Sequence, residues 1–177
     1  MHEEETDVIA KTVRDILVPI ADFPVIAPSA TLREAYALLQ GRHAAGGWRY
    51  RHMLVLDEGG MVAGVLSLQD MLRALMPEYI KASLRQDQAG GGDDRALVAL
   101  WQEGFAAQCR LAADLPVSAC MTEVRHTVDA ADPLTRAAYL MILRGVHMLP
   151  VLDGARVVGV VRIVDVFNQA AAEVLHV

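Results

Sequence analysis

The sequence contains little of what several protein classes require. Cysteine occurs only twice in 177 residues, as Cys109 and Cys120. The two lack a C-x-x-C spacing and have no histidine at ligand spacing, so neither a disulfide framework nor a metal site is predicted. No stretch reaches the length of a membrane span, and segment 1–7 is acidic where a secretory signal is basic. We therefore expect a cytoplasmic protein that does not enter a membrane.

Positive charge and catalytic motifs are also scarce. Lysine and arginine number 16 against 22 acids, which gives a net charge of -6, and no basic run is present. Nucleic-acid binding needs a concentrated cationic face, so it is not expected. The six histidines belong to no recognisable motif such as G-x-S-x-G or H-E-x-x-H. We predict no catalytic residues and expect that the chain is not an enzyme.

The most informative feature that is present is an internal repeat. Segment 13–19 resembles segment 117–123, and the β-like segment 23–26 matches 125–128. Hydrophobic residues make up 54% of the chain, while aromatic residues make up 5%, so aliphatic side chains must fill the core. The repeat predicts the following division: a tail (1–12), a first repeat (13–76), a linker with a helical insert (77–116) and a second repeat (117–177).

Each repeat is predicted to contain a strand, a helix, a β-hairpin and a second helix. The first helix starts at a capping box, Thr31 to Glu34, and its counterpart starts with Asp132 as cap and Pro133 in the first turn. Glycine-containing turns separate apolar, β-branched runs, which is typical of hairpins. The closing helices are expected at 68–76 and 163–175. Such small units must bury their apolar faces, so we expect an α+β protein whose repeats pack as a pseudo-two-fold pair with clefts between them.

The insert between the repeats has a polar, glycine-rich part at 86–94, which is typical of a linker. A helix capped by Asp94 should follow, because apolar residues recur every four positions. We expect this stripe to pack on the rest of the chain or on a second subunit; it contains Leu97, Trp101, Phe105 and Cys109. An extra loop at 42–49 in the first repeat could shape one cleft.

Two equivalent segments lie where each predicted hairpin leads into the closing helix. Their matching positions are Gly64, Ser67 and Asp70 in the first repeat, and Gly159, Arg162 and Asp165 in the second. Glycine permits close approach of a ligand to the backbone, and a helix amino terminus attracts phosphate. An aspartate one turn later can accept both hydroxyls of a ribose. The pattern predicts a cleft for a nucleoside or a nucleotide.

A purely structural alternative exists for these residues. Ser67 and Asp70 can form a capping box that only satisfies the helix end. In the second repeat, Arg162 cannot accept an amide proton, so Asp165 lacks a capping partner of that kind. A ligand explains such an aspartate, although the helix dipole also favours an acid in the first turn.

With these motifs in both halves, the chain resembles the cystathionine β-synthase (CBS) domain family. Gly64, Ser67 and Asp70 fit the family signature G-h-x-[ST]-x-x-D, and segment 145–151 fits its G-h-x-x-h-P-V strand. The second repeat departs from the signature at Arg162, where a small hydroxyl residue is usual. The likeness covers 13–76 and 117–175.

The resemblance implies a regulatory Bateman module that senses AMP, ADP, ATP or S-adenosylmethionine as an effector and requires no cofactor. It also implies association into a homodimer. The regulated partner is expected to be a separate chain, which the sequence does not identify. The alternative is a scaffold that dimerises or binds a protein without any small ligand.

The family's site residues can be carried over by position. The first cleft would use Val25, Ile26, Arg51, His52, Gly64, Ser67 and Asp70. The second would use Thr127, Val128, His147, Met148, Gly159, Arg162 and Asp165. In that second cleft, Arg162 would either reach a phosphate or fill the space.

Overall fold

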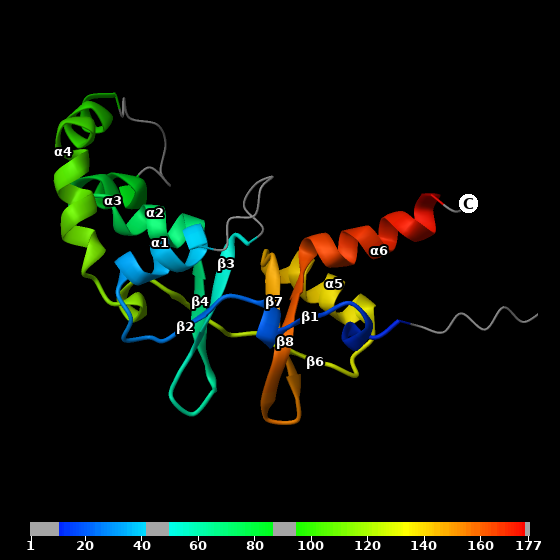
Figure 1. The fold of residues 1–177 in the computed structure, drawn as a ribbon. Helices are drawn as coiled ribbons and strands as arrows, with labels where there is room; N and C mark the ends of the chain where they lie inside the picture. Colours follow the sequence, from blue (N-terminus) through cyan, green and yellow to red (C-terminus); the bar gives the residue numbers. More distant parts are fainter. Residues whose placement is uncertain (1–10, 42–49, 87–94, 176–177) are drawn as a thin grey trace, which may run out of the picture. The chain divides into compact units, whose positions relative to one another are not determined.

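The computed structural model describes residues 11–41, 50–86 and 95–175 (Figure 1). Most of the predicted tail, the extra loop at 42–49, the glycine-rich part of the linker and the Asp94 cap lie outside the described residues. The chain forms two units. We call the unit made of 24–59 and 63–123 the N-repeat unit, and the unit made of 1–23, 60–62 and 124–177 the C-repeat unit.

The N-repeat unit contains a four-stranded sheet with helices, and its strand order is β2-β3-β4-β5. β2 and β3 are parallel, whereas β4 and β5 are antiparallel. Its strands are β2 (Val25–Ile26), β3 (His52–Leu56), β4 (Val62–Ser67) and β5 (Thr122–Glu123). Its helices are α1 (Leu32–Gly41), α2 (Leu68–Ala74), α3 (Glu78–Gln86) and α4 (Arg95–Ala113), followed by a 3-10 turn (Val117–Ala119).

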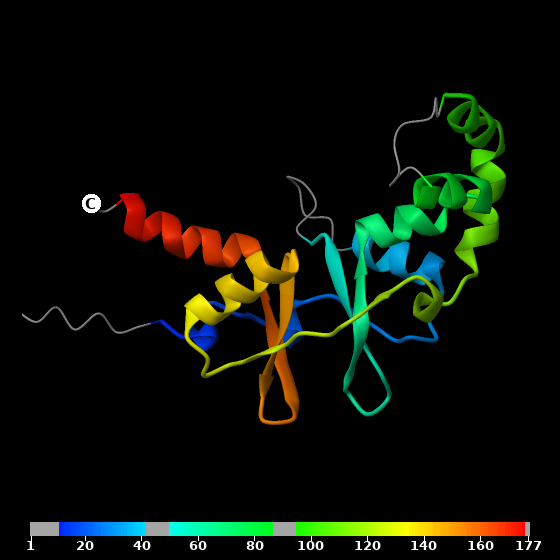
Figure 2. The same cartoon turned by 180° about the vertical axis from the view of Figure 1, so that it is seen from behind.

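The C-repeat unit contains a second four-stranded sheet, with the order β1-β8-β7-β6. Both of its helices lie on the same side of this sheet (Figures 1 and 2). The strands are β1 (Val18–Pro19), β6 (Val128–Asp129), β7 (Met148–Asp153) and β8 (Arg156–Arg162), and the helices are α5 (Leu134–Arg144) and α6 (Ile163–Leu175). Two 3-10 turns flank β1, at Val13–Asp15 and Ile20–Asp22. The predicted α+β class and the order strand, helix, strand, strand, helix are therefore confirmed in both repeats.

The opening strand of each repeat pairs with the sheet of the other repeat. β1 joins β8, with Val18 opposite Val160 and Pro19 opposite Gly159. β5 joins β4 in the equivalent register, with Glu123 opposite Gly64. The sequence repeat predicted these segments but not their partners, because matching halves alone do not show which sheet a short strand completes.

Glycine makes this pairing possible in both sheets. A Cβ atom built on Gly64 would lie 2.8 Å from the carbonyl oxygen of Thr122 and 2.7 Å from the sulfur of Met121. A Cβ atom on Gly159 would meet the carbonyl oxygen of Val18 in the same way. The glycines thus admit a neighbouring strand. We expected these glycines to leave the backbone open to a ligand. That expectation is wrong on the side where a Cβ would stand, because the neighbouring strand occupies it.

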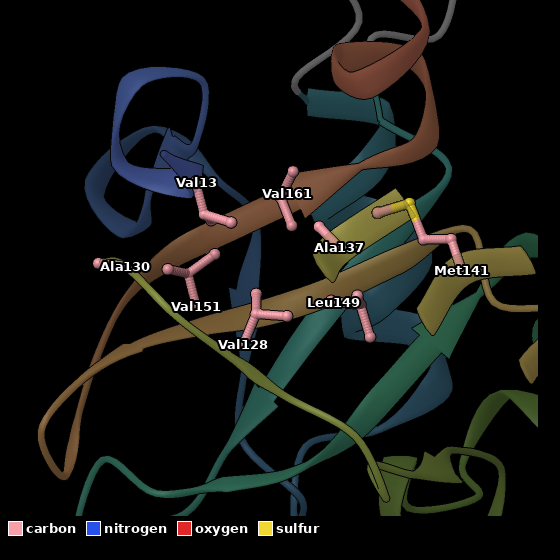
Figure 3. Close-up of a cluster of buried hydrophobic side chains, with 8 residues drawn as sticks. All are labelled: Val13, Val128, Ala130, Ala137, Met141, Leu149, Val151 and Val161. Atoms are coloured by element: carbon pink, nitrogen blue, oxygen red, sulfur yellow. The ribbon is translucent and has the colours of Figure 1, made fainter. Parts of the chain in front are cut away.

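The core of the C-repeat unit is a cluster of fully or almost fully buried side chains (Figure 3). It joins the opening segment to the sheet and α5, because Val13 packs with residues of β6, β7, β8 and α5. The members are Val13, Val128, Ala130, Ala137, Met141, Leu149, Val151 and Val161. Ala137 and Met141 lie one turn apart, as the predicted helical stripe requires.

The two helix starts differ from each other in chemistry. The predicted capping box of α1 is confirmed, because the Thr31 N–H donates to the Glu34 carboxylate at 2.6 Å and the Glu34 N–H donates to the Thr31 hydroxyl at 3.3 Å. The prediction for α5 is wrong. Pro133 is itself the N-cap residue and makes no side-chain cap, while the carboxylate of Asp132 accepts the Asp129 N–H at 2.9 Å.

The described part of the insert contains two helices, whereas only the second was predicted. α3 was missed because its apolar residues are few, although Lys81 and Arg85 both pair with Glu78 along one side of the helix. α4 packs against α1 and α3 of the same unit. Within its predicted stripe the Phe105 side chain remains exposed. Among the described helices, none combines the length and apolar character that a membrane crossing needs.

Replacing Gly159 by alanine should destabilise the protein. The new methyl group would overlap the backbone of β1 at Val18 and force that strand away, so we expect the free energy of unfolding to fall by about 1–3 kcal/mol. Gly104→Ala is the matched control, because a Cβ on Gly104 meets nothing within 4 Å. That helical substitution should raise stability by up to about 1 kcal/mol. Urea unfolding followed by circular dichroism measures both; unchanged stability of Gly159→Ala would contradict the β1–β8 pairing.

Candidate functional site

An open pocket of about 550 Å³ lies at the start of β3 and the junction of β4 with α2. It is lined by Arg51, His52, Ser67, Leu68 and Gln69. The two chain segments are tied together, because the Leu68 N–H donates to the Arg51 carbonyl at 3.0 Å. Three of the lining residues were predicted. Leu68 and Gln69 were not, although they fill the variable positions of the same signature, where residue type carries no signal.

Ser67 and Asp70 form the capping box that the sequence left open as an alternative. The Asp70 N–H donates to the Ser67 hydroxyl at 3.1 Å. In return, the Ser67 N–H and hydroxyl donate to Oδ2 of Asp70 at 2.9 and 2.6 Å. The aspartate therefore holds in place the serine that lines the pocket.

The other oxygen of Asp70 reaches two further elements. Oδ1 accepts from the Arg73 guanidinium at 3.1 Å and from the Thr122 hydroxyl of β5 at 3.3 Å. Among the described residues Asp70 is the only charged side chain in the buried class, at 7% exposure. These donors offset the cost of burying the carboxylate. A ribose could bind Asp70 only by replacing one of them.

Several other predicted site residues serve the core. Ile26 is buried and pairs with Val55 in the parallel register of β2 with β3. Val128 takes the equivalent position opposite Val151 and belongs to the core cluster of the C-repeat unit. Met148 is also buried. Such residues can offer a ligand their backbone, but their side chains already pack inside the protein.

The remaining predicted residues have mixed surroundings. Val25 and Thr127 are half-buried at equivalent positions, Thr127 lying just before β6, and His147 is exposed at the start of the β7 hairpin. The Ile163 N–H donates to the His147 carbonyl at 2.9 Å. This bond repeats the one between Leu68 and Arg51, so the backbone of the two junctions is alike.

The second junction differs in its side chains. Arg162 forms a bidentate ion pair with Asp165, at 2.8 Å from Nε to Oδ2 and 2.6 Å from Nη2 to Oδ1. The Arg162 N–H also donates to Asp165 at 2.9 Å. The inference that Asp165 lacks a capping partner is therefore wrong, because it counted only acceptor side chains and overlooked that the arginine can itself donate. The Arg162 side chain is 26% exposed and that of Asp165 is 12% exposed.

The cysteines and acids do not form a metal site within the described residues. No group of three or more His, Cys, Asp or Glu side chains there is placed to hold an ion. Cys120 lies in the N-repeat unit just before β5, and partial burial raises the pKa of its thiol above the ordinary value. A thiol with a raised pKa carries less thiolate near neutral pH and is therefore less nucleophilic.

Comparison with known proteins agrees with the repeat pattern. The model of the CBS domain matches residues 13–77 and 116–171, which together are more than half of the chain. No curated protein matches the chain significantly.

Similar solved structures share the fold at low sequence identity. The crystal structure of CBSX2 in complex with AMP is 22% identical and has a TM-score of 0.61, with 91% of this chain and 96% of that chain covered. The CBS domain of a membrane protein from Sphaerobacter thermophilus is 23% identical, with a TM-score of 0.62 and coverage of 89% and 86%. A CBS-domain containing protein from Agrobacterium tumefaciens is 18% identical, with a TM-score of 0.62 and coverage of 91% and 94%.

Removing the Ser67 hydroxyl should weaken the start of α2 and the support of Asp70. We expect Ser67→Ala to lower the free energy of unfolding by about 1–2 kcal/mol, because a helix cap and a donor to a buried carboxylate are lost together. Ser67→Thr should retain most of this stability, since the hydroxyl remains. Ser118→Ala, at an exposed serine of the same unit, serves as the control. Wild-type stability of Ser67→Ala in urea titration would contradict the capping network.

Proposed function

Because the chain belongs to the CBS domain family, whose model matches both of its repeats, we propose that it is a regulatory module that binds an adenosine-containing ligand. The observation that carries the proposal is the pocket formed by Arg51, His52 and Ser67 at the β4–α2 junction. It offers a guanidinium, an imidazole and a hydroxyl to one ligand. Its volume of about 550 Å³ falls within the range of roughly 300–1,000 Å³ that is usual for small-molecule sites.

Arg51 is the residue that we propose binds the ligand's phosphate in this pocket. Its side chain is exposed, and a guanidinium presents several donors in a plane that matches phosphate oxygens. The net charge of the chain is -6, so a local cation is needed to attract a phosphate. AMP is the first ligand to test, since the similar CBSX2 was crystallised with it; ADP, ATP and S-adenosylmethionine are the alternatives.

Asp70 is proposed to bind the ribose by exchange of hydrogen bonds. Its Oδ2 holds the Ser67 hydroxyl at 2.6 Å, and a ribose hydroxyl can take the place of that donor. Oδ1 keeps its contacts with Arg73 and Thr122. Hence the first junction remains our preferred site, whereas the second would first have to open the ion pair between Arg162 and Asp165.

We propose that the module performs no chemistry itself. It would act in the cytoplasm on a separate protein, or through association with a second copy of this chain. A ligand-free scaffold is the second candidate, and a specific observation favours it: each carboxylate oxygen of Asp70 and Asp165 already accepts from one of the protein's own donors. Ligand binding decides between the two.

A ligand panel tests the adenosine specificity. A ligand that binds only the folded state stabilises it by about 2.7 kcal/mol at about 100 times its dissociation constant. We expect AMP and at least some other adenosine compounds to raise the melting temperature, and GTP to have a smaller effect. Equal shifts with GTP would contradict the adenosine specificity. No shift with any compound, together with no heat in calorimetric titration, would favour the scaffold.

Arg51→Gln tests the phosphate contact directly. Losing charge-assisted hydrogen bonds costs roughly 1.5–3 kcal/mol, so AMP affinity should fall by about tenfold to more than a hundredfold. Adenosine affinity should change little, because it has no phosphate. Arg85→Gln is the control, since Arg85 is an exposed arginine of the same unit that pairs with Glu78 on α3. Isothermal titration of the wild type and both variants with AMP and with adenosine gives these affinities; equal loss for adenosine and AMP would remove Arg51 from the phosphate site.

A further inference from the structure

The aspartate of the first junction is held by three side chains. Asp70 accepts the Ser67 hydroxyl on Oδ2 at 2.6 Å. Its Oδ1 accepts from the Arg73 guanidinium at 3.1 Å and from the Thr122 hydroxyl at 3.3 Å. The guanidinium comes from within α2, after the aspartate, so the position before the helix is left to the small side chain of Ser67. That position lines the pocket.

The second repeat lacks all three of these donors. Arg162 stands at the position of the serine, and the exposed Asn168 stands at the position of the α2 arginine. Val18 takes the place of Thr122 in the register of the opening strands, and valine has no hydroxyl to donate. Among the described residues, the side-chain donors to Asp165 all belong to Arg162, which reaches Oδ2 at 2.8 Å and Oδ1 at 2.6 Å. One guanidinium therefore replaces three donors.

Arg162 also fills the position that a ligand would use. In the first junction this position carries a hydroxyl beside an open pocket of about 550 Å³. In the second it carries a side chain that is only 26% exposed and pairs with Asp165, whose side chain is 12% exposed. A ribose needs carboxylate oxygens as acceptors, and both oxygens of Asp165 already accept from this guanidinium. The arginine thus makes the contacts that ligand hydroxyls would otherwise make.

We propose that Arg162 takes the place of a ligand at the second junction, so that each chain binds one adenosine-containing molecule, at the first junction. The class of ligand rests on the proposed function. A ligand could enter the second junction only by leaving Arg162 or Asp165 without its partner. Removing one partner from a largely buried ion pair is costly, so we expect this junction to bind AMP about a hundredfold more weakly than the first, or weaker still.

The rest of the second junction resembles the first. Its backbone makes the same link, from the Ile163 N–H to the His147 carbonyl at 2.9 Å. The side chain of His147 is exposed, as is that of Arg51 at the equivalent position. A hydroxyl in place of Arg162 would cap α6 and donate to one oxygen of Asp165, as in the first repeat, and the other oxygen could then accept from a ribose. Position 162 is therefore the one that we expect to decide how many ligands bind.

Equilibrium dialysis of the full chain with radiolabelled AMP measures this number directly. We expect the wild type to bind one AMP per chain and folded Arg162→Ser to bind two. Arg136→Ser is the matched control, because Arg136 lies on α5 and also pairs with a nearby aspartate, Asp132, at 3.2 Å. That variant should still bind one AMP. Circular dichroism and urea unfolding show which variants are folded.

The reciprocal exchange tests the same position in the first junction. Ser67→Arg places a guanidinium three residues before Asp70, as Arg162 lies three residues before Asp165, and should abolish the AMP site there. Combining Ser67→Arg with Arg162→Ser should restore one AMP per chain by moving the site to the second repeat. If Arg162→Ser does not fold, Ser67→Arg carries the test. A folded Ser67→Arg variant that binds AMP as well as the wild type does would contradict the proposal.

The other outcomes separate the role of Arg162 from the proposed function. One AMP bound by both the wild type and folded Arg162→Ser would overturn the role of Arg162 and leave the proposed function intact. Two AMP bound by the wild type and one by Arg162→Ser would also overturn it, because the arginine would then bind the ligand's phosphate. No AMP bound by the wild type but one by Arg162→Ser would support the role of Arg162 and reject the first pocket as the ligand site. No AMP bound by any folded variant would contradict both.

Discussion

The exchange of opening strands is the constraint on which the rest of this structure depends. Each sheet ends in a two-residue strand supplied by the other repeat, and the close approach is possible only because Gly64 and Gly159 have no side chain. A sheet that lacks such a strand leaves an unpaired edge with exposed backbone donors and acceptors. Each sheet is therefore built from strands of both repeats.

The exchanged strand β5 also reaches the candidate site. Thr122, two residues after Cys120, donates to Asp70, and Asp70 holds the Ser67 that lines the pocket. A ligand that displaced the Ser67 hydroxyl would change the surroundings of a buried carboxylate, where hydrogen bonds are strong because the local dielectric is low. The pocket and the crossing strand thus share one network.

The two repeats carry different side chains on the same backbone. Their junctions make equivalent backbone bonds, from Leu68 to Arg51 and from Ile163 to His147. The first keeps a serine and an open pocket, whereas the second carries Arg162 clamped on Asp165. The two repeats also differ outside the junctions. The insert helix α4 contacts α1 of the first repeat, whereas α5 and α6 of the second repeat keep large apolar side chains exposed. The two repeats therefore differ both at their junctions and on their helices.

Apart from Arg51 and His52, which came from the family resemblance, the sequence by itself determined the repeats, the α+β order of elements, the capping box at Thr31 and the pocket residue Ser67. These follow from local rules, since hydrophobic period, turn glycines and cap spacing act over a few residues. The tertiary structure decided the partners of β1 and β5, the space taken up beside Gly64 and Gly159, and the ion pair that occupies Asp165. It also decided that Ile26 and Val128 face the core. Each of these depends on which distant segment lies beside a residue, and pairing between segments far apart in the chain leaves no periodic signal in either one.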